Sequence, residues 1–250
     1  MVFMNTASAR EHAIKHTKLM EKNYAKQINE SVSKTVVCGK NVIIPTDDHV
    51  KTIPSVEVVN VDSIHAILDR DKSEKTAVLD FASYMYHGEK YAAGMINQET
   101  YLFHHSYLYE VLTMFVNTYY EYNNEHRNNY LFENRALYVP DVIFEDNISR
   151  SCDVIVCSAP NWRRASKIGV NETQNSEALK SRMKFIKAIT EANKVETLIL
   201  GAWGCGIFKQ DPKEVAETFK QIFKYSTIKN IVYAVPDAKN FKVFKEVFES

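Results

Sequence analysis

The chain has 250 residues, and 45% of them are hydrophobic, which is enough to bury the core of one large domain. Its 31 basic and 31 acidic side chains cancel, and the isoelectric point lies near 7.1. Broad nucleic-acid binding is therefore not expected, because each phosphate contact needs a neutralising cation, and we interpret the basic cluster Trp162-Arg-Arg164 as solvated surface.

Residues 8–30 are polar and rich in helix formers, which predicts one or two helices on the outside of the domain. From residue 35 onward, short apolar runs alternate with helical segments. Several runs are apolar at consecutive positions, which is typical of strands covered on both faces. The predicted strands are residues 35–37, 42–44, 56–61, 77–82, 154–157, 197–200 and 231–234.

The first helix predicted after the early strands spans residues 108–119. Leu108, Leu112, Phe115 and Tyr119 recur there at the spacing of one buried helix face. The segment 120–135 that follows is rich in Asn, Glu and His. We predict that it is a long surface excursion.

Two further helices are predicted near the end of the chain. One begins at Pro212, with Asp211 as its N-cap and Glu214 completing a capping box. The last begins near Asp237. The residues expected to be buried on these two helices are Val215, Phe219, Ile222, Phe223, Phe241, Phe244 and Phe248. Strands that alternate with helices imply a mainly parallel sheet between two helix layers.

The four cysteines, Cys38, Cys152, Cys157 and Cys205, form no C-x-x-C pair, and three of them lie in or beside apolar runs. We interpret them as buried thiols of a reducing compartment, not as disulfides or zinc ligands. The sequence shows no secretory signal and no run of ~18 apolar residues. These features predict a cytoplasmic protein.

Three of the seven glycines fall together, at Gly201, Gly204 and Gly206, between the strand 197–200 and the helix from residue 212. Ligands bind at the carboxyl ends of strands in open α/β sheets, and successive backbone N–H groups there can hold a phosphate. Trp203 and Phe208 could stack on a sugar or a base. The same residues also suit a tight turn whose aromatic side chains enter the core, and the glycine pattern alone does not separate the two. The spacing differs from G-x-G-x-x-G, so a Rossmann dehydrogenase is not expected.

The segment Gly201-Ala-Trp-Gly-Cys-Gly-Ile-Phe-Lys-Gln-Asp-Pro212 resembles the G-A-W-G-C-G-[VI]-F-x-N-D-P signature of microbial-type poly(ADP-ribose) glycohydrolases, which are macrodomains. Val78-Leu-Asp-Phe-Ala-Ser83 is similar to the family's V-L-N-F-A-S, and residues 94–109, 138–142 and 158–161 follow the family in the same order. The resemblance implies a three-layer α/β/α macrodomain with a mixed, mainly parallel central sheet. It also implies a helical extension over residues 1–34, packed on one globular unit over residues 35–250.

The resemblance further implies a pocket for ADP-ribose. The backbone of Gly204, Cys205, Gly206 and Ile207 would face the diphosphate, and Phe208 would lie beside the distal ribose. The other residues expected at this site are Asp80, Phe81, Gly88, Gln98, Glu99, Thr100, Gly201 and Trp203.

The half of the site opposite the glycine-rich loop departs from the family pattern. The family's G-G-G is Gly88-Glu89-Lys90 here, and its Q-E-E is Gln98-Glu99-Thr100. The second glutamate of the family attends the glycosidic oxygen and activates water, which a threonine cannot do. Near a diphosphate, Lys90 would attract, whereas Glu89 would repel unless turned away.

Two carboxylates remain near the changed motif. Glu99 is the candidate catalytic residue, and its alternative role is to accept a hydrogen bond from a ribose hydroxyl at the start of a helix. Asp80 replaces the family's asparagine. His87 and the pair His104-His105 could serve as acids or bases, although such histidines more often pack or lie on the surface.

Three functions stay open on the sequence. We expect a binding module that captures ADP-ribose or a related NAD-derived nucleotide, free or on an ADP-ribosylated protein, without cleaving it. The alternative is a glycohydrolase that works through Glu99, Asp80 or a histidine; a scaffold that has lost its pocket is the third. We expect a monomer that needs no metal ion or cofactor and contacts no membrane. Analogy at the level of the fold suggests a place in phage–host conflict.

Overall fold

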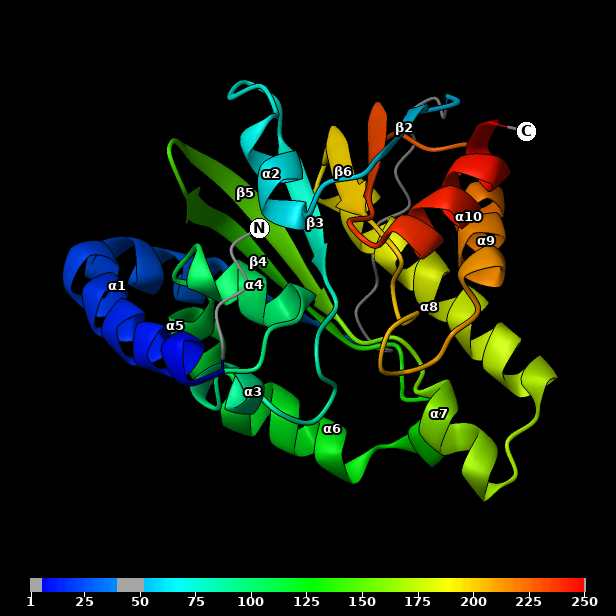
Figure 1. The fold of residues 1–250 in the computed structure, drawn as a ribbon, viewed down its shortest axis with the longest axis horizontal. Coiled ribbons are helices and arrows are strands. Elements are labelled where there is room, and N and C mark those ends of the chain that lie inside the picture. The colour runs from blue at the N-terminus through cyan, green and yellow to red at the C-terminus, as the bar shows by residue number, and fades with distance from the viewer. Residues whose placement is uncertain (1–5, 40–51, 250) are drawn as a thin grey trace.

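The computed structural model describes residues 6–39 and 52–249, and within them the chain forms one mixed sheet covered by helices (Figure 1). The strands are Val36–Cys38 (β1), Ser55–Val59 (β2), Thr76–Asp80 (β3), Ala136–Glu145 (β4), Ser149–Cys157 (β5), Thr197–Leu200 (β6) and Asn230–Ala234 (β7). The α-helices are Thr6–Lys34 (α1), Ser63–Leu68 (α2), Glu89–Ala92 (α3), Gln98–His104 (α4), Leu108–Thr113 (α5), Tyr122–Glu125 (α6), Trp162–Ala165 (α7), Glu172–Ala192 (α8), Pro212–Ile222 (α9) and Ala238–Glu249 (α10).

The sheet has seven strands in the order β1-β4-β5-β3-β6-β7-β2. The β1–β4 and β4–β5 pairs are antiparallel, and the other four pairs are parallel. The predicted mixed, mainly parallel sheet is confirmed. The predicted strand at residues 42–44 lies outside the described residues.

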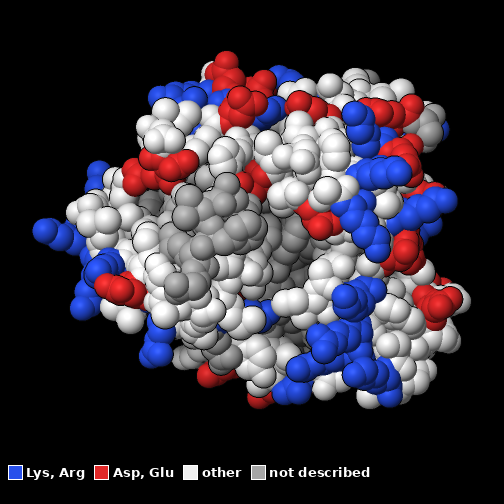
Figure 2. Space-filling view, in the orientation of Figure 1, with Lys and Arg blue, Asp and Glu red and all other residues white. Residues whose placement is uncertain are grey.

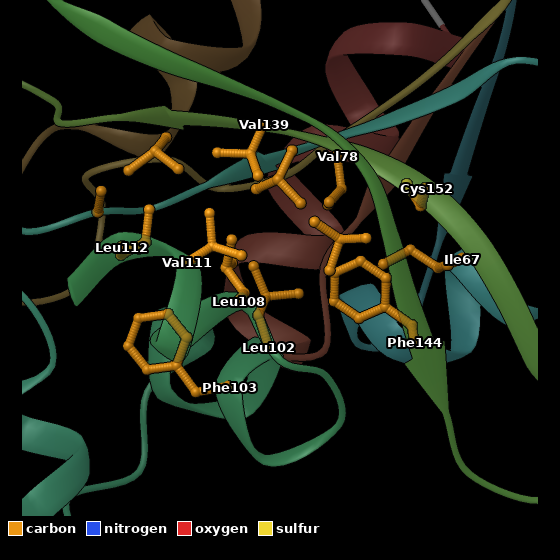
Figure 3. Packing of buried hydrophobic residues seen from close by; sticks show 14 of the residues in the cluster. Ile67, Val78, Leu102, Phe103, Leu108, Val111, Leu112, Val139, Phe144 and Cys152 are labelled. Carbon is orange, nitrogen blue, oxygen red and sulfur yellow. The ribbon is translucent and has the colours of Figure 1, made fainter. Parts of the chain in front are cut away.

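Two hydrophobic cores make the three layers, because successive side chains of a strand point to opposite faces. Val78, Ile199 and Val232 face a core shared with α1, α2, α4 and α5, part of which Figure 3 shows. Leu79 and Leu198, one position away on their strands, face a second core shared with α8, α9 and α10. None of the helices within the described residues is long and apolar enough to cross a bilayer.

The predicted amino-terminal helix is present as α1, and it packs on α5 and β4. Tyr24 has non-helical dihedral angles (φ −122°, ψ 17°), so α1 consists of two helical segments. Its buried residues are small or unbranched: Ala9, Ala13, Met20 and Ser31. Few buried apolar side chains are needed on α1, because it packs on α5 and β4 with one face only.

The longest strand, β4, was not predicted. Pro140 interrupts its apolar pattern and lacks an N–H for a ladder hydrogen bond. The structure accommodates it with an irregularity in pairing between Val139 and Val142, where Asp141 has a φ of +61°. A bulge of this kind lets the strand continue across a residue that breaks the sequence signal.

The predicted helix over residues 108–119 is wrong in its second half. α5 ends at Thr113, and residues Val116–Glu121 form a π-helical turn. The wider turn buries both Tyr119 and Tyr120. The segment 120–135 is likewise not wholly on the surface, since the ring of Phe132 is buried and stacks on Tyr84 with centroids 4.1 Å apart.

The predicted start of α9 is confirmed, with one correction. Asp211 accepts hydrogen bonds from the N–H groups of Lys213 and Glu214, and Pro212 occupies the first turn. Glu214 does not complete a capping box, because its carboxylate accepts a hydrogen bond from Ser176 of α8. This bond ties α9 to α8 on the second helix layer.

Candidate ligand-binding site

Two adjoining cavities lie where β3, β6 and β7 end, on the face that Figure 2 shows hollowed near its centre. The first, of about 250 Å³, lies between the glycine-rich loop after β6 and the helices α3 and α4. The second, of about 230 Å³, lies beside the loop after β7. They share Phe81, Asn97, Gln98, Ala202 and Asn240, so together they form one elongated site.

The glycine-rich loop has unpaired backbone donors on residues that line the first cavity. Gly206, Ile207 and Phe208 line it, and their N–H groups have no acceptor within the described parts of the chain. The N–H of Cys205 is engaged, since it donates to the carbonyl of Ala202 at 3.2 Å. Consecutive free N–H groups in a loop are the arrangement that binds phosphate oxygens.

Two glycines of this loop are required by close packing, and the third is not. A Cβ on Gly201 would lie 2.5 Å from the carbonyl oxygen of Ala234, at the end of β7. Gly204 has a φ of +78°, and a Cβ there would lie 2.8 Å from the side chain of Ala159. Gly206 has open space around it. The loop therefore keeps its shape at Gly201 and Gly204 and remains open to a ligand at Gly206.

The aromatic residues of the loop have different roles. Trp203 borders the cavity, but its indole is fully buried and donates to the carbonyl of Cys157 at 3.1 Å. Trp203 is thus a core residue and not a stacking surface for a sugar or a base. Phe208, which is half-buried, leaves an aromatic ring available at the cavity wall.

Gln210, which replaces the family's asparagine, fixes the far end of the loop. It is 2% exposed, and its amide exchanges two hydrogen bonds with the amide of Asn175. A further bond from Gln210 Nε2 reaches the carbonyl of Pro160 at 2.8 Å. Gln210 therefore connects the loop to α8 and to the segment before α7.

The opposite wall is held by Gln98 at the start of α4. Its Oε1 accepts from the N–H of Phe81 at 2.8 Å, and its Nε2 donates to the carbonyl of Leu79 at 3.0 Å. Gln98 thus fastens α4 to the end of β3. Phe81 borders both cavities.

Thr100 does not line either cavity. It completes a capping box with Asn97, and its hydroxyl donates to the carbonyl of Met95 at 2.8 Å. A threonine at this position thus stabilises the first turn of α4, and its hydroxyl is unavailable to a ligand in this arrangement.

Asp80 and Glu99 form a buried pair of carboxyl groups behind the first cavity. Asp80 is fully buried, and neither of its oxygens has a hydrogen-bond partner within the described residues. Burial, and then the charge of Glu99, raise the pKa of Asp80 well above its ordinary value. Glu99 itself lines the cavity and accepts a hydrogen bond from the N–H of Ser83 at 3.0 Å. Burial raises the pKa of Glu99 to about 7.

Lys90 supplies the positive charge of the cavity wall. It lines the first cavity, and its charge lowers the pKa of Glu99, partly offsetting burial. Gly88 lies outside the cavity lining and is needed for packing, because its φ is +61° and a Cβ would lie 2.2 Å from the ring of Tyr109. The expectation about the side chain of Glu89 falls outside what the structure describes.

The candidate acids or bases His87, His104 and His105 do not line either cavity, and neither does Cys205. Burial raises the pKa of the Cys205 thiol to about 12, so it is not a reactive thiolate. His104 contacts His12 of α1, with 2.9 Å between their Nδ1 atoms, and burial lowers its pKa to about 4. Within residues 6–39 and 52–249, no group of three or more His, Cys, Asp or Glu could hold a metal ion.

The second cavity was not anticipated from the sequence. It is mainly apolar and includes Asp62 from the loop after β2, Pro236 from the loop after β7 and Tyr101 from α4. A signal existed, because the carboxyl ends of parallel strands meet at one edge of a sheet. This rule predicts that the segments following residues 59 and 234 lie beside the glycine-rich loop.

Comparisons with known proteins agree with this geometry. The family model described as microbial-type PARG, catalytic domain, where PARG is poly(ADP-ribose) glycohydrolase, matches residues 4–146. No curated protein matches the chain.

Solved structures extend the likeness of the fold beyond residue 146. The poly(ADP-ribose) glycohydrolase from Thermomonospora curvata is 22% identical, with a TM-score of 0.88, covering 97% of this chain and 100% of that one. Its complex with the inhibitor ADP-HPD is also 22% identical, with a TM-score of 0.86 and coverage of 96% and 99%. The Deinococcus radiodurans enzyme in complex with ADP-ribose is 22% identical, with a TM-score of 0.78 and coverage of 89% and 97%. The predicted three-layer fold is confirmed.

Proposed function

The chain belongs to the family of microbial-type poly(ADP-ribose) glycohydrolase catalytic domains, and on this premise we propose that its two cavities bind ADP-ribose, or a related NAD-derived nucleotide, without cleaving it. The observation that carries the proposal is that Gly206, Ile207 and Phe208, whose N–H groups have no acceptor within the described residues, line a cavity with Lys90 in its wall. A diphosphate is the part of the nucleotide that these donors and this cation suit.

The second cavity supports the proposal of a ligand that has an aromatic base at one end and charged phosphates further along. Its mainly apolar lining includes Phe81 and Tyr101, which offer aromatic surface to a base. The first cavity would then hold the diphosphate and the distal ribose beside Phe208. Phe81 and Asn240, which border both cavities, would lie near the junction between the two ends.

Binding without cleavage follows from Thr100. The family's acid at this position is replaced by a hydroxyl that the helix cap already uses. A hydroxyl with no ionisation near neutral pH cannot donate a proton to a leaving group or activate water. The chain would therefore act as a reader or a sequestering module for the nucleotide.

Gly206→Glu tests the binding proposal. The space around Gly206 lets the variant fold, while its carboxylate would repel the diphosphate. We expect the Kd for ADP-ribose to weaken by about 100-fold or more in calorimetry. Gly206→Ala is the matched control and should bind within a few-fold of wild type. The absence of any heat or thermal shift with wild type and ADP-ribose would refute the proposal.

Hydrolysis through Glu99 is the second candidate function, favoured by one observation. A carboxyl group that lines the cavity and has a pKa of about 7 can both give and accept a proton near neutral pH. Glu99 could then replace the lost acid. Because Glu99 is one residue before the family's acid position on α4, the scissile bond of its substrate would have to lie at a different place in the cavity from that of the family's substrate.

Release of ADP-ribose from ADP-ribosylated protein distinguishes the two functions. If Glu99 is the acid, wild type should release ADP-ribose and Glu99→Gln should slow release by about 100-fold or more, with ADP-ribose binding retained. No release by wild type would leave binding alone as the function. Release that persists in Glu99→Gln would remove Glu99 from the chemistry.

A further inference from the structure

A group of basic residues lies on α7 and next to Phe208, which lines the first cavity. Arg163 and Arg164 lie on α7, Lys167 lies in the turn that follows it, and Lys209 comes directly after Phe208; all four are exposed. We call these four residues the α7 rim. The N–H of Arg163 donates to the carbonyl of Phe208 at 2.9 Å, which fastens α7 to the residue that lines the cavity. Figure 2 shows basic side chains gathered at the lower right, beside the hollow, where Figure 1 places α7.

The charge of the α7 rim is not neutralised. Within the described residues, no carboxylate lies within 4.0 Å of these four cations. Residues 158–171 contain no acidic side chain, and Asp211 is used to cap α9. On α9 and α10, by contrast, lysines such as Lys213 and Lys245 pair with a glutamate four residues on. The rim is thus a local positive surface on a chain with no net charge.

Aromatic rings lie among these cations. The guanidinium of Arg164 is 5.4 Å from the ring centroid of Tyr130, and Tyr130 and Trp162 are both partly exposed. The N–H of Asn161 donates to the carbonyl of Tyr130 at 2.8 Å, so this ring is anchored to the start of α7. Cations that contact phosphates, interleaved with rings on which bases stack, are the features of surfaces that bind single-stranded nucleic acid.

We propose that the α7 rim binds single-stranded nucleic acid that carries a terminal ADP-ribosyl group, with that group in the cavity and the first nucleotides of the strand on α7. The inference rests on the proposed function. The cavity supplies the main affinity and the rim adds a second contact on the same molecule, so a small patch suffices where unmodified nucleic acid would bind poorly. A peptide carrier has no series of phosphates for the rim. A second ADP-ribose unit would concentrate its charge in one diphosphate, whereas these cations are spread over α7, the next turn and the loop.

Charge reversal on α7 tests the proposal. The variant is Arg163→Glu with Arg164→Glu, and the control is Lys180→Glu with Lys184→Glu on α8, two exposed lysines without an ion pair within the described residues. The probes are free ADP-ribose, an eight-nucleotide single strand with a terminal ADP-ribosyl group, the same strand unmodified, an ADP-ribosylated peptide, and a short ADP-ribose polymer. Their Kd values are measured at 50 and 200 mM NaCl.

Wild type should bind the modified strand at least about 10-fold more tightly than free ADP-ribose at 50 mM salt. The α7 variant should lose this advantage. For the modified strand, its plot of the logarithm of the binding constant against the logarithm of the salt concentration should be less steep than that of wild type by about 1 to 2, since each phosphate contact contributes about 0.7 to the slope. Its affinity for free ADP-ribose should stay within a few-fold of wild type, and the α8 control should change neither.

Four results would overturn the proposal. Wild type could bind the modified strand and free ADP-ribose with equal affinity, or it could bind the ADP-ribosylated peptide or the polymer more tightly than the strand. The α7 variant could still bind the modified strand more tightly than free ADP-ribose, or the α8 control could lose this difference as fully as the α7 variant. Failure of wild type to bind free ADP-ribose is a separate result, because it refutes the proposed function itself.

Discussion

Replacing Asp80 with asparagine should raise the thermal stability of the protein at pH 7. Asp80 is fully buried, and both of its oxygens lack a hydrogen-bond partner within the described residues. Folding at pH 7 must therefore either bury a charge or bind a proton, and both are unfavourable. An asparagine has nearly the same shape and carries no charge. We expect a stabilisation of about 2–3 kcal/mol, which corresponds to a rise in Tm of about 5–10 °C.

The effect of Asp80→Asn should depend on pH. The pKa of Asp80 is raised in the folded state, so the folded protein binds more protons than the unfolded chain. The wild-type carboxyl then costs nothing below its unfolded pKa, and the free energy of unfolding falls as pH rises toward the folded pKa. Glu99, raised from 4.5 to about 7, acts in the same direction between those two values. The advantage of the variant should therefore grow from pH 5 to pH 8 in thermal melts.

Asp153 provides the matched control for this prediction. It is also buried, but it accepts hydrogen bonds from the hydroxyl of Tyr138 and from the N–H of Asp141. Asp153→Asn should therefore destabilise the protein. If Asp80→Asn lowers the Tm at pH 7 as Asp153→Asn does, Asp80 has a partner that stabilises its charge, and the interpretation of the Asp80–Glu99 pair is wrong.

Gly201→Ala should have the largest destabilising effect of any single methyl group added to the glycine-rich loop. The new Cβ would lie 2.5 Å from the carbonyl oxygen of Ala234 and 3.1 Å from the ring of Phe81. The closer atom belongs to the backbone of β7, which cannot rotate away as a side chain could. We expect a loss of about 3 kcal/mol or more, measured by urea denaturation.

The same substitution should also weaken ligand binding, because the clash pushes on Phe81, which borders both cavities. Gly206→Ala is the control, since nothing lies within 4 Å of its added Cβ. Equal stability of the two variants would show that the loop tolerates a displacement from β7, and the packing argument would then fail.

The sequence predicted the sheet well where apolar runs were continuous. β3, β6 and β7 were found within a residue or two, because strands buried on both faces leave no other plausible pattern. β4 was missed because Pro140 and Asp141 belong to a bulge, which depends on the partner strand and not on local preference. The π-helical turn after α5 was missed for the same reason. It depends on the burial of two adjacent tyrosines, Tyr119 and Tyr120, in the core and not on local sequence preference.

The glycine-rich loop could also be predicted, because its glycines stand out in the sequence and its motif resembles that of the family. The division of roles within it could not be. Trp203 turns into the core to reach the carbonyl of Cys157, an acceptor 46 residues away in the chain. The proximity of Asp80 and Glu99 likewise arises only when α4 packs against the end of β3. The basic cluster of α7 is visible in the sequence, but its place beside Phe208 depends on the packing of α7 on the glycine-rich loop. Such juxtapositions have no local signal.

The walls of the two cavities come from segments spread between Asp62 and Asn240, and this has a consequence for how the protein is made. Asn240 of α10 borders both cavities, and β7, which orders that region, pairs in parallel with β2 and β6. A growing chain on the ribosome therefore has no complete site until synthesis has passed α10. Until β7 itself has been made, the edges of β2 and β6 lack their shared neighbour. The ligand can thus select only molecules in which α10 has been made and packed, and its binding would report on the folding of this part of the chain.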